Sequence, residues 1–120
     1  MIGLPTLSSL DRSTTLRIWL ATEPADMRRG FDRLAETARS VTGLDPLCGH
    51  LFLFRSRGGD RLKVLYWDKD GYALWYKRLE EGTFKLPRLD GTQRSVELRA
   101  SELAMMLGSG SSGTVERQAG

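Results

Sequence analysis

The stretch from His50 to Leu79 alternates strand-forming apolar residues with arginine and lysine around two glycine-bearing turns. A period of two residues is typical of strands that bury one face, and Gly- and Asp-containing turns separate successive strands of a hairpin. The segment therefore predicts an antiparallel meander, with strands over residues 51–54, 61–67 and 72–78.

The faces of this meander depend on its second turn, Asp68 to Gly71. If Gly71 takes a positive φ and forms a bulge, Asp68 pairs with Tyr72. One face would then carry Leu62, Val64, Tyr66, Leu74 and Tyr76, and the other Arg61, Lys63, Leu65, Trp67, Ala73, Trp75, Lys77 and Leu79. A shift of one residue would exchange the cross-strand partners but keep the alternation within each strand. The predicted basic, Trp-bearing face is therefore conditional on this register.

The meander also carries the excess positive charge of the chain. It holds seven basic and three acidic residues, whereas the remainder of the chain holds eleven basic and twelve acidic residues. The net charge of the whole chain is +3. Such a surface suits a nucleic acid, because phosphate contacts supply affinity and aromatic rings add stacking on bases. An ordinary solvated sheet face explains the same composition equally well.

Residues 16–20 alternate apolar and polar side chains and predict a further strand. Small polar and acidic residues from Thr22 to Asp26 are typical of a helix start, and Gly43 suits a left-handed C-cap. The helix is predicted over residues 25–41, with a continuous apolar stripe made of Met27, Phe31, Leu34, Ala35, Ala38 and Val41. Gly30 would lie inside it, where glycine costs about 1 kcal/mol relative to alanine.

The rest of the chain adds a strand over residues 95–98 and a short helix over residues 101–107, capped by Ser101. Residues 1–15 are interpreted as an irregular arm and residues 108–120 as a flexible Gly/Ser-rich tail. The predicted fold is one small α+β domain over residues 16–107. It contains a mostly antiparallel sheet of about four to five strands, one main helix packed on the sheet and the short C-terminal helix.

Cys48 is the single cysteine, which excludes an intrachain disulfide and a cysteine-based zinc site. The N-terminus lacks the pattern of a signal peptide, and no apolar run approaches the ~20 residues that span a bilayer. We therefore expect a soluble cytoplasmic protein with no membrane contact. His50 is the single histidine, and the sequence contains no nucleophile motif, so no catalytic triad is predicted.

The aspartates are better explained as turn residues than as metal ligands. Asp68 and Asp70 resemble the opening of a calcium loop, but Leu79 stands where the bidentate glutamate would be. A two-metal nuclease would need convergent carboxylates from Asp26, Asp60, Asp68 and Asp70, whose positions favour structural roles. No metal ligand, cofactor or catalytic residue is predicted.

Arginines near the predicted helix form a second basic cluster. Arg28, Arg29 and Arg33 could contact phosphate or an acidic partner, although a solvated helix face also accounts for them. Combined with the meander, the candidate nucleic-acid-binding residues are Arg28, Arg29, Arg55, Arg57, Arg61, Lys63, Trp67, Trp75, Lys77 and Arg78.

Three segments carry a resemblance to a known family: R-I-W-L-A-T-E-P-A-D-M-R-R-G-F-D-R-L-A (17–35), residues 43–84 with the run W-D-K-D-G-Y-A-L-W-Y-K-R, and L-A-M-M-L (103–107). The chain resembles TnpB, the accessory protein from the second open reading frame of IS sixty-six type bacterial insertion sequences. That family is unrelated to the RNA-guided nuclease of the same name. The resemblance places its recurring positions on Asp26, Met27, Arg28, Gly30, Phe31, Arg55, Asp60, Arg61, Lys63, Trp67, Asp68, Gly71, Lys77 and Arg78.

The resemblance implies a role in transposition, beside a second small accessory protein and a larger transposase that carries the acidic catalytic residues. We therefore expect a non-enzymatic accessory protein that binds DNA, the transposase complex, or both through the basic, Trp-bearing face. The alternatives are an interaction adaptor without direct DNA contact and, less favoured, a metal-dependent nuclease.

Overall fold

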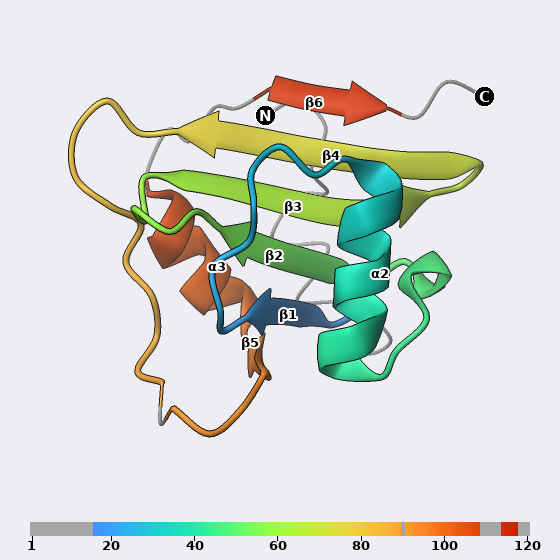
Figure 1. Ribbon diagram of the computed structural model, residues 1–120, viewed down its shortest axis with the longest axis horizontal. Coiled ribbons are helices and arrows are strands. Elements are labelled where there is room, and N and C mark those ends of the chain that lie inside the picture. Colours follow the sequence, from blue (N-terminus) through green and yellow to red (C-terminus); the bar gives the residue numbers. More distant parts are fainter. Residues whose placement is uncertain (1–15, 90, 109–113, 118–120) are drawn as a thin grey trace.

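The chain folds around one six-stranded sheet, shown in Figure 1. The computed structural model describes residues 16–89, 91–108 and 114–117. The strands lie in the order β5-β1-β2-β3-β4-β6; β1 and β2 run parallel, and the other neighbouring pairs run antiparallel. Their bounds are Ile18–Ala21 (β1), Leu51–Arg55 (β2), Arg61–Asp68 (β3), Gly71–Arg78 (β4), Ser95–Leu98 (β5) and Thr114–Arg117 (β6).

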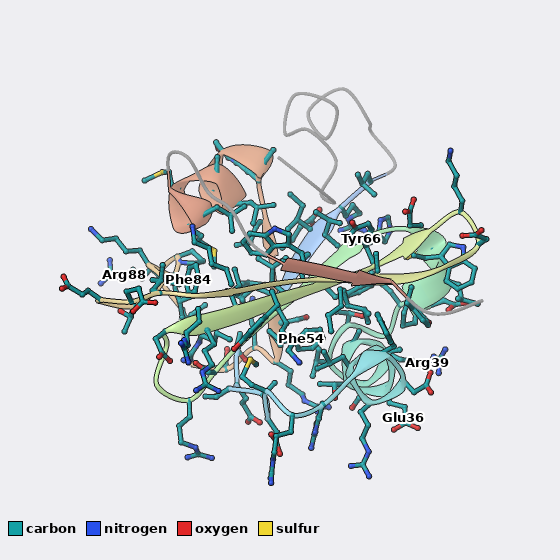
Figure 2. The ribbon with its side chains drawn as sticks, turned by 90° about the horizontal axis from the view of Figure 1, so that it is seen from above. Glu36, Arg39, Phe54, Tyr66, Phe84 and Arg88 are labelled. Carbon is teal, nitrogen blue, oxygen red and sulfur yellow. The ribbon has the colours of Figure 1, made fainter. Side chains whose placement is uncertain are left out.

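Helices cover both faces of this sheet. The view along the sheet in Figure 2 shows α2 (Phe31–Thr42) on one side and α3 (Ala100–Leu107) on the other. A short 3₁₀ helix, η1 (Pro46–Cys48), connects α2 to β2. The predicted α+β class, with one main helix and a short C-terminal helix on a mostly antiparallel sheet, is confirmed. Within the described residues, no helix is long and apolar enough to cross a membrane.

Each face of the sheet has its own apolar core. The cluster under α3 contains Ile18, Leu20, Leu51, Leu53, Leu62, Val64, Tyr66, Ala73, Trp75, Phe84, Leu98, Ala100, Leu103, Met106 and Leu107. The cluster under α2 contains Ala21, Leu34, Ala35, Ala38, Phe52, Phe54, Leu65, Tyr72 and Leu74. Because both faces are buried, β2 reads as a continuous apolar run, as central strands of covered sheets do.

The apolar stripe predicted for the main helix does face the core, but the helix begins later than predicted. α2 starts at Phe31, and Gly30 is its N-cap rather than an interior residue. Residues 25–29 form a loop, because their backbone groups have partners outside a helix. The N–H of Ala25 donates to the carbonyl of Arg55 at 2.9 Å, and Asp26 Oδ1 accepts from the N–H of Arg28 at 2.9 Å. Gly43 ends the helix with φ 75°, as predicted.

The register predicted for the second hairpin is wrong by one residue. Asp68 pairs with Gly71 rather than with Tyr72, and the turn between them contains two residues. The residue with positive φ is Lys69, at 60°, and the N–H of Asp70 donates to the Asp68 carbonyl at 2.6 Å. This geometry is a γ-turn centred on Lys69, so no bulge forms at Gly71.

Two features differ at the C-terminal end. The N-cap of α3 is Arg99 instead of Ser101, and the Arg99 N–H donates to Glu102 Oε1 at 2.8 Å. Residues 114–117, predicted to belong to a flexible tail, form β6 and pair with Ala73–Tyr76 of β4. The exposed edge of β4 offers unpaired backbone groups, which a short extended segment can satisfy. The rest of the predicted tail after Gly108, and the predicted N-terminal arm, lie outside the described residues.

Candidate functional site

A groove lies between the loop that follows β1 and the turn that joins β2 to β3. Its volume is about 610 Å³, and it is lined by Pro24, Ala25, Asp26, Met27, Arg28, Ser56, Arg57, Gly58, Asp60 and Arg61. Three of the predicted nucleic-acid-binding residues, Arg28, Arg57 and Arg61, therefore surround one groove. They come from segments about 30 residues apart in the sequence, so the tertiary fold brings them together. We call this feature the arginine groove.

Arg28 is both oriented and exposed. Its Nη2 lies 2.9 Å from Asp26 Oδ2, and its Nε donates to Asp26 Oδ1 at 3.1 Å. The Arg28 side chain is nevertheless 91% exposed. The hydrogen bond from the Arg28 side chain, followed by the one from its N–H, lowers the pKa of Asp26 to about 2. Asp26 is therefore ionised at neutral pH and orients the guanidinium at the edge of the groove.

The opposite wall of the groove is the β2–β3 turn, which is held by side-chain hydrogen bonds of Ser56. Ser56 is 7% exposed; its hydroxyl donates to Asp60 Oδ1 at 3.2 Å and accepts from the N–H of Arg61 at 3.1 Å. Gly59 has φ 79°, and a Cβ there would lie 3.2 Å from the Thr83 side chain. This turn holds Arg57 at its exposed tip, whereas Arg61 begins β3 and is half-buried.

The β3–β4 register extends the basic surface on the α2 side of the sheet. Arg61 and Arg78 lie directly opposite each other, and residues that face one another across an antiparallel pair share a face. Lys77 pairs with Leu62 instead, on the α3 side. Two like charges in direct opposition are unfavourable unless an anion lies nearby. The candidate residues are thus divided between the faces, with Arg61, Lys63 and Arg78 on one and Lys77 on the other.

Two of the residues predicted to bind DNA, Lys63 and Arg55, contact the loop after β1. Lys63 Nζ donates to the carbonyls of Met27 at 2.7 Å and Arg29 at 3.0 Å. Arg55 Nη2 donates to the carbonyl of Thr22 at 3.1 Å. Both side chains are half-buried and reach from the sheet to the loop backbone. In the structure they therefore join the loop to the sheet.

The two tryptophans of the meander lie on opposite faces of the sheet. Trp75 pairs with Val64 on the α3 side and is fully buried, so its ring is not available to stack on a base. Trp67 is half-buried on the α2 side, where its ring packs edge-on against Tyr72 with centroids 5.2 Å apart. The shared basic, Trp-bearing face predicted from the sequence does not form, because the hairpin register differs by one residue.

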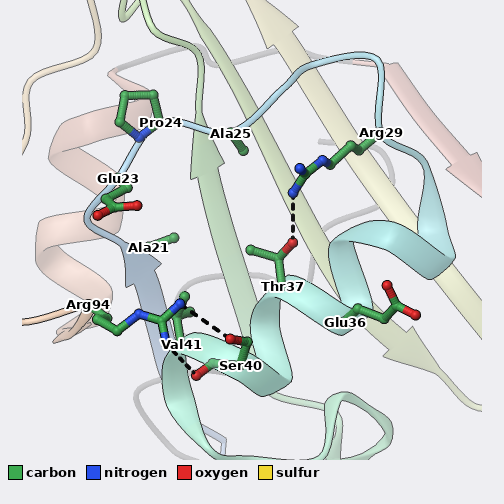
Figure 3. A pocket seen from close by; sticks show the side chains of 10 residues that line it. All are labelled: Ala21, Glu23, Pro24, Ala25, Arg29, Glu36, Thr37, Ser40, Val41 and Arg94. Atoms are coloured by element: carbon green, nitrogen blue, oxygen red, sulfur yellow. Dashed lines mark hydrogen bonds between the residues drawn. The ribbon is translucent and has the colours of Figure 1, made fainter.

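A second hollow of about 420 Å³ lies on the other side of the same loop, against α2 (Figure 3). Arg29 donates to the Thr37 hydroxyl at 3.1 Å, and Arg94 contacts the hydroxyl and carbonyl of Ser40 at 3.3 Å. Glu23 and Glu36 also line it, so its charge is mixed. Sequence reasoning missed Arg94, because pairing of β5 with β1 places it there and no local pattern signals that contact.

The four aspartates considered for metal binding do not form one cluster, although Asp26 and Asp60 both line the arginine groove. Asp60 precedes β3 and Asp68 ends it, so an eight-residue strand separates them by about 26 Å at ~3.3 Å per residue. Among the residues that the structure describes, no group of three or more His, Cys, Asp or Glu side chains could hold a metal ion.

The sequence profile of a protein family agrees with the resemblance noted above. The family described as IS66 Orf2 like protein matches residues 16–116. The chain belongs to this family. Two relatives come from Sinorhizobium fredii (strain NBRC 101917 / NGR234), and both carry the description "uncharacterized protein". The first, y4hO, is 39% identical over 98 residues, which cover 82% of this chain and 84% of the relative.

The second relative, y4jC, is 45% identical over 75 residues, which cover 62% of this chain and 64% of the relative. No solved structure matches the chain at a significant level. Membership of the IS66 Orf2-like family is consistent with an accessory role in transposition and implies association with the transposase system. The match also extends beyond α3 into β6.

Proposed function

We propose that this member of the IS66 Orf2-like family is a non-enzymatic transposition accessory protein that binds the DNA backbone through the arginine groove. The observation that carries the proposal is the convergence of Arg28, Arg57 and Arg61 on one groove. Arginine guanidinium groups bind phosphate oxygens through two parallel hydrogen bonds, and each neutralised phosphate releases counterions. The cytoplasm, where a bacterial element's DNA lies, is the compartment in which we place this role.

The geometry favours phosphate contacts over base stacking. Trp75 is fully buried, and the ring of Trp67 packs against Tyr72. With Trp75 buried and the Trp67 ring packed against Tyr72, affinity should depend mainly on charge, so it should vary little with base sequence and strongly with salt. Arg78, which pairs with Arg61 and is exposed, would extend this contact along the α2 side of the sheet.

The test is the salt dependence of affinity for duplex DNA. Alanine substitution of Arg28, Arg57 and Arg61 together should weaken binding and flatten the slope of log K against log salt by about 2.7, at ~0.9 per phosphate contact. The matched control replaces Arg39, Lys85 and Arg88, three exposed residues outside the groove lining, with alanine. Equal losses of DNA affinity in the two triple variants would contradict the proposal, because they would show an effect of net charge alone.

The two alternative functions receive less support. An adaptor without DNA contact would need anchor residues other than Trp75, which is fully buried. A two-metal nuclease would need several convergent carboxylates, and of the four considered, Asp60 and Asp68 lie at opposite ends of β3. Copurification with the transposase and the second accessory protein, combined with no DNA binding at low salt, would favour the adaptor.

A further inference from the structure

Lys63 occupies an unusual position for a residue on a basic surface. Its ammonium reaches from β3 to the loop after β1 and donates to the carbonyls of Met27 and Arg29, 36 and 34 residues away in the sequence. These two carbonyls flank Arg28 on both sides. The lysine therefore binds the backbone immediately before and after Arg28, an exposed side chain of the arginine groove.

The surroundings of Lys63 explain why it points to the loop. Tyr76 lies directly opposite on β4, and the Lys63 Nζ is 5.5 Å from the centre of its ring. A half-buried ammonium needs acceptors to offset its lost hydration, and the two carbonyls supply them. With two of its three donors directed at the loop, Lys63 is poorly placed to contact a phosphate.

Asp26 completes the arrangement around Arg28. It accepts from the N–H and the guanidinium of Arg28, and its own carbonyl accepts from the N–H of Arg29 at 3.1 Å. Lys63 thus fixes the backbone and Asp26 the side chain, while the guanidinium stays exposed. A side chain that is ordered before it binds its partner loses less conformational entropy on binding.

We infer that Lys63 is a positioning residue, which holds the Met27 and Arg29 carbonyls so that Arg28 presents its guanidinium to a DNA phosphate. This inference rests on the proposed function, since it assigns a role within the same groove. Lys63 differs in this respect from Arg57, whose side chain is exposed at the tip of its turn. It acts on DNA through Arg28 and not by direct contact.

The first experiment needs no DNA. In Lys63→Met, ¹⁵N relaxation should show residues 26–30 changing from rigid order parameters near 0.85 to values below about 0.6. The matched control is Lys77→Met, which removes the same charge from the α3 side of the sheet. Unchanged order at residues 26–30 in Lys63→Met would overturn the inference. If that variant does not fold, Lys63→Gln, which is polar but uncharged, is measured in its place.

The second experiment is a double-mutant cycle with Arg28→Ala, read as affinity for duplex DNA at fixed salt. Lys63→Met and Arg28→Ala should each weaken binding about tenfold, and the double variant should be no weaker than Arg28→Ala by more than about twofold. A loss of about a hundredfold in the double variant would mean that Lys63 contacts DNA directly. If the unmodified protein binds no DNA, the proposed function fails, and the relaxation measurement still decides whether Lys63 orders the loop.

Discussion

Val64 of β3 and Trp75 of β4 lie directly opposite each other on the α3 side of the sheet, and both side chains are fully buried. The register of the hairpin decides the face on which Trp75 lies, because a shift of one residue would move Trp75 to the other face. Trp75 therefore belongs to the core, whereas Trp67, on the opposite face, is half-buried.

We predict that the two tryptophans differ in their effect on stability. Trp75→Ala should lower the free energy of unfolding by about 3–5 kcal/mol, because it leaves a large cavity in the core. Trp67→Ala should cost less, since its ring is half-buried and solvent can fill the vacated space. Urea denaturation followed by circular dichroism measures both, and equal losses would contradict this assignment.

A glycine at position 69, in the turn between β3 and β4, should make the protein more stable. Lys69 has φ 60°, a conformation that costs a residue with a side chain on the order of 1 kcal/mol and costs glycine almost nothing. Lys69→Gly should therefore raise the free energy of unfolding by roughly 0.5–1 kcal/mol. Asp70→Gly is the control, because Asp70 has no positive φ and glycine there should be destabilising.

The start of α2 lacks a side-chain cap. Gly30 is the N-cap, with an extended backbone at φ −99°, and apart from its two chain neighbours no described residue has an atom within 4 Å of where a Cβ would stand. Gly30→Ser should supply a hydroxyl for the free N–H groups and stabilise the protein by a few tenths to about 1 kcal/mol. Gly30→Ala, which adds no acceptor, is the control in a comparison of melting temperatures. A serine variant no more stable than the alanine variant would argue against capping.

The imidazole of His50 should make stability depend on pH. The N–H of Arg17 donates to His50 Nδ1 at 3.0 Å, so this nitrogen must be unprotonated. Burial, followed by the charge of Arg17, lowers the pKa of His50, and Glu97 opposes the shift. Because the folded-state pKa lies below that of the unfolded chain, stability is complete above the ordinary value near 6.5 and falls as pH drops through it.

The check for this prediction is His50→Asn, whose amide oxygen can accept the same hydrogen bond without titrating. Chemical denaturation at pH 8 and pH 5 should show a larger loss of stability in the unmodified protein than in the variant. An identical pH dependence in both proteins would exclude His50 as the source.

Much of the fold could be predicted from the sequence, because it depends on neighbouring residues. Alternation along β1, β3 and β4 is a property of consecutive positions, since successive side chains of a strand point to opposite faces. The left-handed cap at Gly43 is equally local and occurs as predicted, and so does the apolar stripe of α2 except for Met27, which lies in the preceding loop. Local charge singled out Arg28, Arg57 and Arg61 as candidates in two separate clusters, but it did not predict that they line one groove.

The hairpin register and the start of α2 could not be predicted from local patterns, because they depend on the tertiary structure. The register between β3 and β4 depends on the turn conformation at Lys69. The predicted register, which differs by one residue, would place Trp67 and Trp75 on one face of the sheet, whereas the observed register places them on opposite faces. The start of α2 moves to Phe31 because Arg55 and Lys63, both on the sheet, bind the backbone of the preceding loop. Local sequence therefore established which side chains could share a strand face or helix stripe. Hydrogen bonds between residues 30 or more positions apart established which of them meet around the arginine groove.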